Sequence, residues 1–344
     1  MRRPWLAPLV PLYRVGLGWR ELRFKNGPIR RLAWSVISIG NLSTGGAGKT
    51  PLTIALAKLL TARGVHVDVL SCGYGRKNQE PTRVDPSGIA EQFGDEPLLI
   101  AREAGVPVYV APQRYKAGRM AEADTTIGAQ ETLSGKHEFR RSPVTAAHIL
   151  DDGFQHRQLD RAVDILLLNR DDWRDALLPA GNLREGLRAT MRAEVIAIPG
   201  DDVELEVELK RRGWAGQVWR LKRCMEVPSI QEPVFAFCGI ARPEQFFSGL
   251  ERGGLHVAAR NAFRDHHGYT RGDLDKLFAA ARTARAAALI TTEKDAVRLG
   301  DLTSAFPADL PLNTARLHIE IENADAAIDW LVGCLASSPS TRAL

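Results

Sequence analysis

Residues 43–50 have the sequence Ser-Thr-Gly-Gly-Ala-Gly-Lys-Thr, which is typical of a loop that binds nucleotide phosphates. Glycine tolerates the positive φ angles of a tight loop, and the backbone N–H groups of such a loop point at phosphate oxygens. Lys49 would reach the β- and γ-phosphates, and the Thr50 hydroxyl would coordinate Mg²⁺. The predicted phosphate-binding residues are Ser43, Thr44, Gly45, Gly46, Ala47, Gly48, Lys49 and Thr50.

The segments on either side of this loop bear on whether it is only a glycine-rich turn. Residues 34–39 are apolar and rich in β-branched side chains, as in a buried strand, and residues 51–63 place leucines on one face of a helix. A helix that starts at the loop adds the partial positive charge of its N-terminus. The order strand, loop, helix therefore favours phosphate binding, although Ser43 stands where the general motif has its first glycine.

Two acidic residues, Asp151 and Asp152, end an apolar strand that is expected over residues 146–151. An aspartate at a strand end beside a phosphate loop holds Mg²⁺ directly or through water. Asp151, Asp152 and Thr50 are therefore the predicted metal ligands. Adjacent acids at the end of a strand can instead cap a turn, so the pattern alone leaves that structural role open.

Strands and helices alternate after the loop, which predicts a parallel α/β sheet with helices on both faces. The expected strands cover residues 65–71, 106–111, 146–151, 164–169 and 194–199, and a helix is expected over residues 97–104. Residues 121–143 are polar and only weakly periodic, so we expect an inserted surface loop or hairpin there.

A second, smaller α/β unit is expected from residue 218 onward. Its predicted strands are 218–223, 234–239, 288–292 and 317–321, and its predicted helices are 243–252, 271–287 and 324–335. The first and last of these strands bracket the unit, so we expect them to pair as a two-stranded hinge. The predicted fold is a P-loop NTPase-type sheet plus this smaller domain. Its parts are an N-terminal segment (1–30), a nucleotide-binding domain (31–217), a second domain (218–322) and a C-terminal helix and tail (323–344).

Composition indicates an ordinary globular protein of 344 residues, with 44% hydrophobic and 25% charged residues. The four cysteines are scattered, which fits neither a disulfide framework nor a zinc motif and suits a reducing compartment. No apolar run approaches the ~20 residues that a membrane-spanning helix needs. Prolines and arginines interrupt the apolar residues near the N-terminus, so no signal peptide is expected.

The net charge of +5 is concentrated at the N-terminus. Residues 1–31 hold eight basic residues and one acidic residue, whereas the remainder has 38 basic and 40 acidic residues, so no nucleic-acid partner is expected. Trp5, Trp19 and several leucines recur at helical spacing, with Arg14 and Lys25 on the opposite side. This pattern suits a helix that lies on anionic lipids, but it also suits a helix packed on the protein core.

The longer motifs resemble tetraacyldisaccharide 4'-kinase, the lipid A kinase of Gram-negative bacteria. The resemblance rests on Gly40-Asn-Leu-Ser-Thr-Gly-Gly-Ala-Gly-Lys-Thr-Pro51, Asp151-Asp-Gly-Phe-Gln-His156, Gly73-Tyr-Gly-Arg76, Gly94-Asp-Glu-Pro97, Leu178-Pro-Ala-Gly-Asn-Leu-Arg-Glu185, Asp265-His-His267 and Thr291-Thr-Glu-Lys-Asp295. It extends from about residue 5 to residue 335, and Ser43 is normal for the family. Cys72 departs from it, because the family usually has arginine there.

The resemblance implies ATP- and Mg²⁺-dependent phosphorylation of the 4'-hydroxyl of a tetraacylated glucosamine disaccharide 1-phosphate, which gives lipid IVA. It also implies a peripheral protein on the cytoplasmic face of the bacterial inner membrane, without a transmembrane span. The N-terminal helix is then expected to contact anionic membrane lipids, and no obligate protein partner is evident. Lipid chains remain in the bilayer while the headgroup reaches the site, so an interfacial anchor is physically reasonable.

Phosphoryl-transfer chemistry suggests roles for the matching residues. Asp95 is the predicted general base and His266 its support from the second domain. Arg114 and Arg184 are candidates for contacting substrate phosphate or transition-state charge. Tyr74, Arg76, His156 and Glu185 complete the predicted substrate site. Structural alternatives are a helix cap for Asp95, an exposed loop residue for His266, exposed arginines for Arg114 and Arg184, and a buried histidine for His156.

Two other functions fit the phosphate loop by itself. A P-loop kinase of a soluble sugar or cofactor would have the same loop, although it would not need a basic amphipathic N-terminus. A nucleotide switch recruited to a membrane would need no base opposite the γ-phosphate, whereas this chain offers Asp95 and His266.

Overall fold

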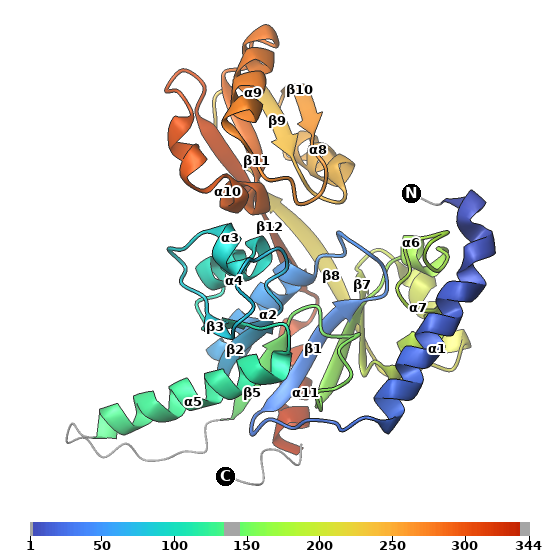
Figure 1. Ribbon diagram of the computed structural model, residues 1–344. Coiled ribbons are helices and arrows are strands. Elements are labelled where there is room, and N and C mark those ends of the chain that lie inside the picture. The colour runs from blue at the N-terminus through green and yellow to red at the C-terminus, as the bar shows by residue number, and fades with distance from the viewer. Residues whose placement is uncertain (1–2, 134–144, 338–344) are drawn as a thin grey trace.

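Twelve strands form one continuous sheet in the computed structural model, which describes residues 3–133 and 145–337 (Figure 1). The sheet order is β10-β9-β11-β12-β8-β7-β6-β1-β5-β2-β4-β3. The strands are β1 (Ser35–Asn41), β2 (His66–Ser71), β3 (Thr82–Arg83), β4 (Val108–Val110), β5 (Ala146–Leu150), β6 (Val163–Leu167), β7 (Val195–Pro199), β8 (Gln217–Glu226), β9 (Val234–Cys238), β10 (Val257–Ala262), β11 (Ala288–Thr292) and β12 (Leu312–Ile321).

Helices cover both faces of this sheet. They are α1 (Val10–Asn26), α2 (Lys49–Ala62), α3 (Ala90–Phe93), α4 (Asp95–Glu103), α5 (Arg114–Leu133), α6 (Arg170–Trp173), α7 (Val203–Arg211), α8 (Pro243–Arg252), α9 (Arg271–Thr283), α10 (Glu293–Leu299) and α11 (Ala324–Ser337). Short 3-10 helices cover Pro4–Leu9, Leu187–Arg192 and Gly300–Ala305.

The central strand β1 is buried along its whole length and pairs in parallel with β5 and β6. Its residues alternate between the two faces, so Ile37 and Ile39 pack in the cluster that contains Leu52 and Leu56 of α2, and Val36 packs on the opposite face. A strand buried on both faces must be apolar throughout, which is why this segment is recognisable in the sequence. The predicted parallel α/β core is confirmed.

The expected pairing of the strands near residues 218–223 and 317–321 is present, and both strands are longer than expected. β8 pairs in parallel with β7 and in antiparallel register with β12, from Arg316 opposite Glu226 to Ile321 opposite Leu221. The earlier part of β12 pairs in parallel with β11. We call the part of the sheet from β7 to β3 the nucleotide-binding half and the part from β10 to β11 the second half. Strand β12 pairs with β11 of the second half and with β8, which pairs with β7, so the sheet continues from one half into the other without a break.

The expected loop or hairpin over residues 121–143 is wrong for residues 121–133, which continue helix α5. Ala117 and Ala121 lie one helical turn apart and pack with Val36 and Leu70, so small apolar residues hold this face on the sheet despite the polar sequence around them. Residues 134–143 lie outside the described residues. The sequence also failed to predict β10, α7 and α10.

Several large apolar side chains of the N-terminal segment are exposed to solvent. Trp5, Leu12 and Trp19 are 76%, 72% and 77% exposed. Helix α1 contacts the protein through polar groups instead: Tyr13 donates a hydrogen bond to the Arg184 carbonyl, and Arg20 pairs with Glu185 at 3.1 Å. No helix in the described ranges is long and apolar enough to cross a membrane.

Candidate active site

The phosphate loop joins β1 to α2 and has the backbone that its glycines predict. Gly45, Gly46 and Gly48 have φ angles of 78°, 54° and 91°, which L-residues with side chains rarely adopt. Helix α2 begins at Lys49, so its N-terminal N–H groups face the loop. The loop also touches the second half, because a Cβ added to Gly45 would lie 2.8 Å from that of Ala241.

Lys49 lies between an amide and a carboxylate. Its ammonium donates a hydrogen bond to Asn41 Oδ1 at 2.9 Å and lies 3.5 Å from Asp152 Oδ1. Asp152 also receives a two-pronged contact from Arg184, at 3.0 and 2.9 Å. Burial alone would raise the pKa of Asp152, but Lys49 and Arg184 outweigh it and lower the pKa to about 2.

Asp151 has the opposite electrostatic environment, although it is the adjacent residue. It is 1% exposed, and its oxygens accept hydrogen bonds from Thr53 at 3.3 Å and from Ser71 at 3.4 Å. Burial, followed by the nearby Glu96 and Asp152 carboxylates, raises the pKa of Asp151 to about 7. Carboxylates crowded in this way are stabilised by a divalent cation, and their oxygens are the donors that Mg²⁺ prefers.

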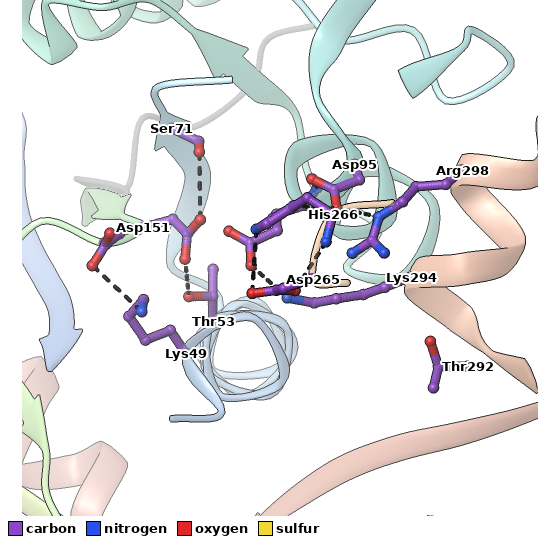
Figure 2. Close-up of polar contacts among 12 residues, drawn as sticks. Lys49, Thr53, Ser71, Asp95, Asp151, Asp265, His266, Thr292, Lys294 and Arg298 are labelled. Atoms are coloured by element: carbon purple, nitrogen blue, oxygen red, sulfur yellow. Dashed lines mark hydrogen bonds and ion pairs between the residues drawn. The ribbon is translucent and has the colours of Figure 1, made fainter. Parts of the chain in front are cut away.

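Across from the loop, Asp95 begins helix α4 and is held by two residues of the second half (Figure 2). Asp95 Oδ2 lies 3.0 Å from His266 Nδ1 and accepts a 2.8 Å hydrogen bond from Arg298. Burial opposes ionisation, but His266 and Arg298 together lower the pKa of Asp95 well below its usual range. The hydrogen bond to Asp95 is also the main reason that the pKa of His266 is raised.

Helix α10 provides two basic residues that the sequence analysis did not single out as functional. Arg298 contacts Asp95 (Figure 2). Lys294 contacts Glu96, the residue next to Asp95. The two basic side chains are four residues apart and therefore lie on one face of the helix. Thr292 caps that helix by accepting a hydrogen bond from the Asp295 N–H. The available signal was that Lys294 lies inside the motif Thr291–Asp295 and that Arg298 follows it by four residues.

These groups face one cavity of about 1440 Å³ between the two halves. Predicted residues that line it are Thr44, Gly45, Gly46, Ala47, Gly48, Lys49, Thr50, Tyr74, Asp95, Asp151, Asp152, Arg184 and His266. The cavity therefore brings together the phosphate loop, the acidic pair and the Asp95–His266 pair. Tyr74 lies at its edge, 70% exposed, with its ring centre 5.4 Å from that of His266.

Arg76 and Glu185 are among the predicted substrate-binding residues that do not line this cavity. Arg76 is 5% exposed and donates to the Glu80 carbonyl at 2.9 Å, so it supports the local turn. Glu185 pairs with Arg20 of α1 at 3.1 Å and with Arg192 at 2.8 Å. In this arrangement Glu185 fastens the N-terminal helix to the body of the protein.

Three further predicted residues, Arg114, His156 and Ser43, are not among those that line the cavity. Arg114 donates to the Pro112 carbonyl at 3.2 Å, and its charge acts on Asp152 and His156. Burial, with a smaller effect of Arg114, lowers the pKa of His156 to about 4, so this imidazole is neutral at pH 7. Ser43 is 2% exposed and forms a backbone bridge with Leu183.

Comparison with known proteins shows similarity over almost the whole chain. The family model described as tetraacyldisaccharide-1-P 4'-kinase matches residues 2–335. A tetraacyldisaccharide 4'-kinase of Koribacter versatilis is 39% identical over 339 residues, which cover 95% of this chain and 98% of that protein. One from Chromobacterium violaceum is 35% identical over 307 residues, which cover 86% and 83%.

A solved structure is similar in fold as well. It is described as the "apo" form of LpxK from Aquifex aeolicus in complex with ATP. Its sequence is 29% identical, the TM-score is 0.69, and the match covers 96% of this chain and 98% of that one. The likeness includes both halves of the sheet, since so little of either chain is left unmatched.

Proposed function

The chain belongs to the tetraacyldisaccharide-1-P 4'-kinase family, and we propose that phosphate transfer takes place in the cavity between its two halves. It is an ATP-dependent kinase of lipid A biosynthesis that phosphorylates the 4'-hydroxyl of tetraacyldisaccharide 1-phosphate. The family predicted from the sequence motifs is confirmed. The proposals below concern the residues, the metal and the membrane.

One observation carries the assignment of the site: the Asp95–His266 pair opens on the same cavity as the phosphate loop. Phosphoryl transfer to a sugar hydroxyl needs a bound γ-phosphate and a proton acceptor close to it. Asp95 comes from the nucleotide-binding half and His266 from the second half. Because each half provides one residue, the pair can accept a proton only when the two halves approach each other. This limits the hydrolysis of ATP when no lipid is bound.

Asp95 and His266 would take the hydroxyl proton as a unit. Asp95 is ionised and has two donors on Oδ2, so its carboxylate fixes the imidazole and stabilises the charge that forms on it. Arg298 acts through Asp95 and is therefore a positioning residue. As the 4'-oxygen forms its bond to the γ-phosphorus, its proton passes to the Asp95–His266 pair. The bond between the γ-phosphorus and the bridging oxygen breaks, and that oxygen leaves with ADP.

Lys49 and Arg184 would neutralise phosphate charge, because both basic groups lie at the cavity wall, where each contacts the Asp152 carboxylate. Thr50, Asp151 and Asp152 would hold Mg²⁺, and the crowding that raises the pKa of Asp151 supports a cation there. When bound, Mg²⁺ would supply further neutralisation of the nucleotide phosphates. Glu96 adds a carboxylate to this region and is paired with Lys294.

The N-terminal helix would place the enzyme on the cytoplasmic face of the inner membrane. Its exposed tryptophans and leucines offer apolar surface for the interface, and the basic residues of 1–31 favour anionic headgroups. We expect that removing residues 1–25, or changing Trp19 and Leu22 to Glu, releases protein from anionic vesicles in a flotation assay. Higher salt should release part of the wild type as well. Undiminished flotation of the truncated chain would contradict the proposal.

The activity test uses purified full-length protein, ATP labelled at the γ-phosphate and the acylated disaccharide 1-phosphate. We expect label in the lipid, at the 4'-position. The deacylated disaccharide serves as a matched acceptor that keeps the hydroxyl but lacks the chains. Transfer to a soluble sugar but not to the lipid would contradict the function. Unchanged transfer in Asp95→Asn would leave the function intact and contradict only the site.

A further inference from the structure

Strands β8 and β12 form a two-stranded ribbon between the two halves (Figure 1). Cys224, His318 and Glu320 lie together on one face of this ribbon. In the antiparallel register Cys224 is opposite His318, and Glu320 is opposite Lys222. Opposed residues have Cβ atoms ~4.5–5.5 Å apart, and residues two apart share a face. Strand pairing therefore brings a thiol, an imidazole and a carboxylate to the same patch.

The other face of the ribbon is occupied by the core. Leu221, Ile319 and Ile321 alternate with the three polar residues along the strands and are buried in the cluster beneath α2 and α11. This alternation fixes the direction of the polar side chains, because a slip of one residue would expose the buried ones. Cys224 and His318 are not among the residues that line the catalytic cavity, although Glu320 borders it.

The donor atoms are close enough for one metal ion. The Cys224 sulfur, a ring nitrogen of His318 and a carboxylate oxygen of Glu320 all lie within 4.8 Å of one another. Tetrahedral Zn²⁺ has bonds of ~2.0–2.3 Å, which separate neighbouring donors by roughly 3.5 Å. The donor separation here exceeds that of a zinc site by little more than about 1 Å. Small χ rotations of these partly exposed side chains can remove this excess.

The surroundings of His318 resemble those of a metal-bound histidine. Its Nε2 lies 3.6 Å from Glu320 Oε1, and its Nδ1 lies 3.6 Å from Glu226 Oε1 on the adjacent strand. Metal-binding histidines commonly donate their other ring N–H to a carboxylate, which fixes the tautomer and orients the ring. Glu226 is placed to do this through Nδ1, while Nε2 faces Glu320.

The charge balance also favours a cation. Two carboxylates of this face, Glu226 and Glu320, each lie 3.6 Å from a ring nitrogen of His318. Lys222 lies 3.2 Å from Glu320 and is 74% exposed, so it can turn into solvent when another cation takes its place. Thiolate, imidazole and carboxylate together suit Zn²⁺ and similar transition metals, and not Mg²⁺ or Ca²⁺.

We propose that Cys224, His318 and Glu320 form a binding site for Zn²⁺ or a similar divalent transition metal, completed by water. Binding makes a sulfur–metal bond as the thiol proton leaves to solvent. The ion would bridge β8 and β12 where the sheet passes from one half to the other. It would therefore stiffen the connection across which the two halves approach each other.

The test uses Co²⁺ as a spectroscopic probe on metal-stripped full-length protein, in excess Mg²⁺ and without nucleotide. Cysteine thiolate bound to Co²⁺ gives a charge-transfer band that oxygen ligands of the kinase site do not give. We expect one equivalent of Co²⁺ to produce this band and Zn²⁺ to abolish it by competition. Absence of the band at millimolar Co²⁺ would overturn the proposal.

Variants assign the ligands. Cys224→Ser should abolish the band, and His318→Ala should weaken binding at least ~10-fold. The matched controls are Cys334→Ser, a half-buried cysteine on α11, and His256→Ala, an exposed histidine of the second half. Both controls should bind as the wild type does. Zn²⁺ should raise the melting temperature of the wild type and of the controls, but not of Cys224→Ser. A band that survives in Cys224→Ser would show that another thiol is responsible.

Discussion

Strands β2 and β5 carry two buried groups of titratable residues, one near the middle of the strands and one at their ends. In the middle, His148 of β5 lies 2.7 Å from Asp68 of β2 and 3.5 Å from Glu122 of α5, with the Trp34 ring stacked on it. At the ends, Asp151 follows β5 and accepts a hydrogen bond from Ser71 of β2. His148 is 0% exposed and Asp151 is 1% exposed, so burial does not distinguish them.

The two groups differ in how their charges are balanced. Burial would lower the pKa of His148, but Asp68 and Glu122 raise it to about 9, so positive and negative charges are paired there. The pKa of Asp151 is raised by burial and by other carboxylates, so like charges are crowded there. The second group opens on the cavity and the first does not. In the first group each buried charge has a partner, so the loss of one member would leave the other unpaired, whereas the crowded like charges of the second group prepare a site for a cation.

The largest effect is expected from His148→Ala, which removes the partner of a buried carboxylate. Breaking a buried ion pair in this way costs about 3–5 kcal/mol of unfolding free energy. Because the folded pKa of about 9 lies above the unfolded value of ~6.5, this stabilisation is fully present below pH ~6.5 and is lost as the pH rises through 9. Urea unfolding at several pH values measures it.

The control for that variant is His66→Ala, which removes a histidine that also touches Trp34 from the neighbouring strand β2. It should cost less unfolding free energy than His148→Ala. Turnover per folded molecule should stay normal in His148→Ala. A loss of turnover without a loss of stability would make the His148 group part of the active site.

Asp95→Asn should have the next largest effect, and it acts on turnover. The amide keeps the shape of the carboxylate but cannot hold His266 as an imidazolium, so we expect a fall of at least ~100-fold. Nucleotide affinity, measured by calorimetry, should change little. Asp202→Asn, at a buried aspartate that caps helix α7 and does not line the cavity, is the matched control. Near-normal turnover would indicate that Asp95 has only a structural role at the start of α4.

Lys49→Ala should remove a contact worth ~2–3 kcal/mol in the transition state, which is a fall of roughly 30- to 150-fold in turnover. The variant should fold normally, because the contacts of Lys49 in the described chain are with Asn41 and Asp152, and Arg184 contacts both of these residues as well. Steady-state kinetics and circular dichroism measure the two properties. Wild-type turnover in this variant would contradict the role of the phosphate loop.

The smallest effect concerns pH and the metal. Mg²⁺ must displace the proton from Asp151, so its affinity in the presence of ATP should rise as the pH rises through about 7, by up to tenfold per unit below that value. The same binding should release protons, which calorimetry in two buffers detects. Asp151→Asn should bind Mg²⁺ weakly and without this dependence. A flat profile in the wild type would mean that Asp151 is already ionised.

Motifs that are contiguous in the chain were predictable, because their geometry follows from local backbone rules. Gly45, Gly46 and Gly48 adopt the positive φ angles that a phosphate loop requires, and the flanking strand and helix follow from apolar periodicity. The family resemblance rests on the same short motifs. The sequence analysis also predicted Asp95 and His266 as partners. His266 Nδ1 lies 3.0 Å from Asp95 Oδ2, although the two residues are 171 positions apart in the chain.

Contacts between distant residues were decided by the tertiary structure. Nothing local indicates that Arg298 bonds Asp95, or that Glu185 pairs with Arg20 of α1 and does not line the cavity. Scattered cysteines excluded a zinc motif in the sequence, yet strand pairing places Cys224 opposite His318. The periodicity of a sequence indicates which face of a helix or strand is buried. The residues that it contacts across that face depend on how the elements pack, because long-range pairing is set by the sum of many weak contacts.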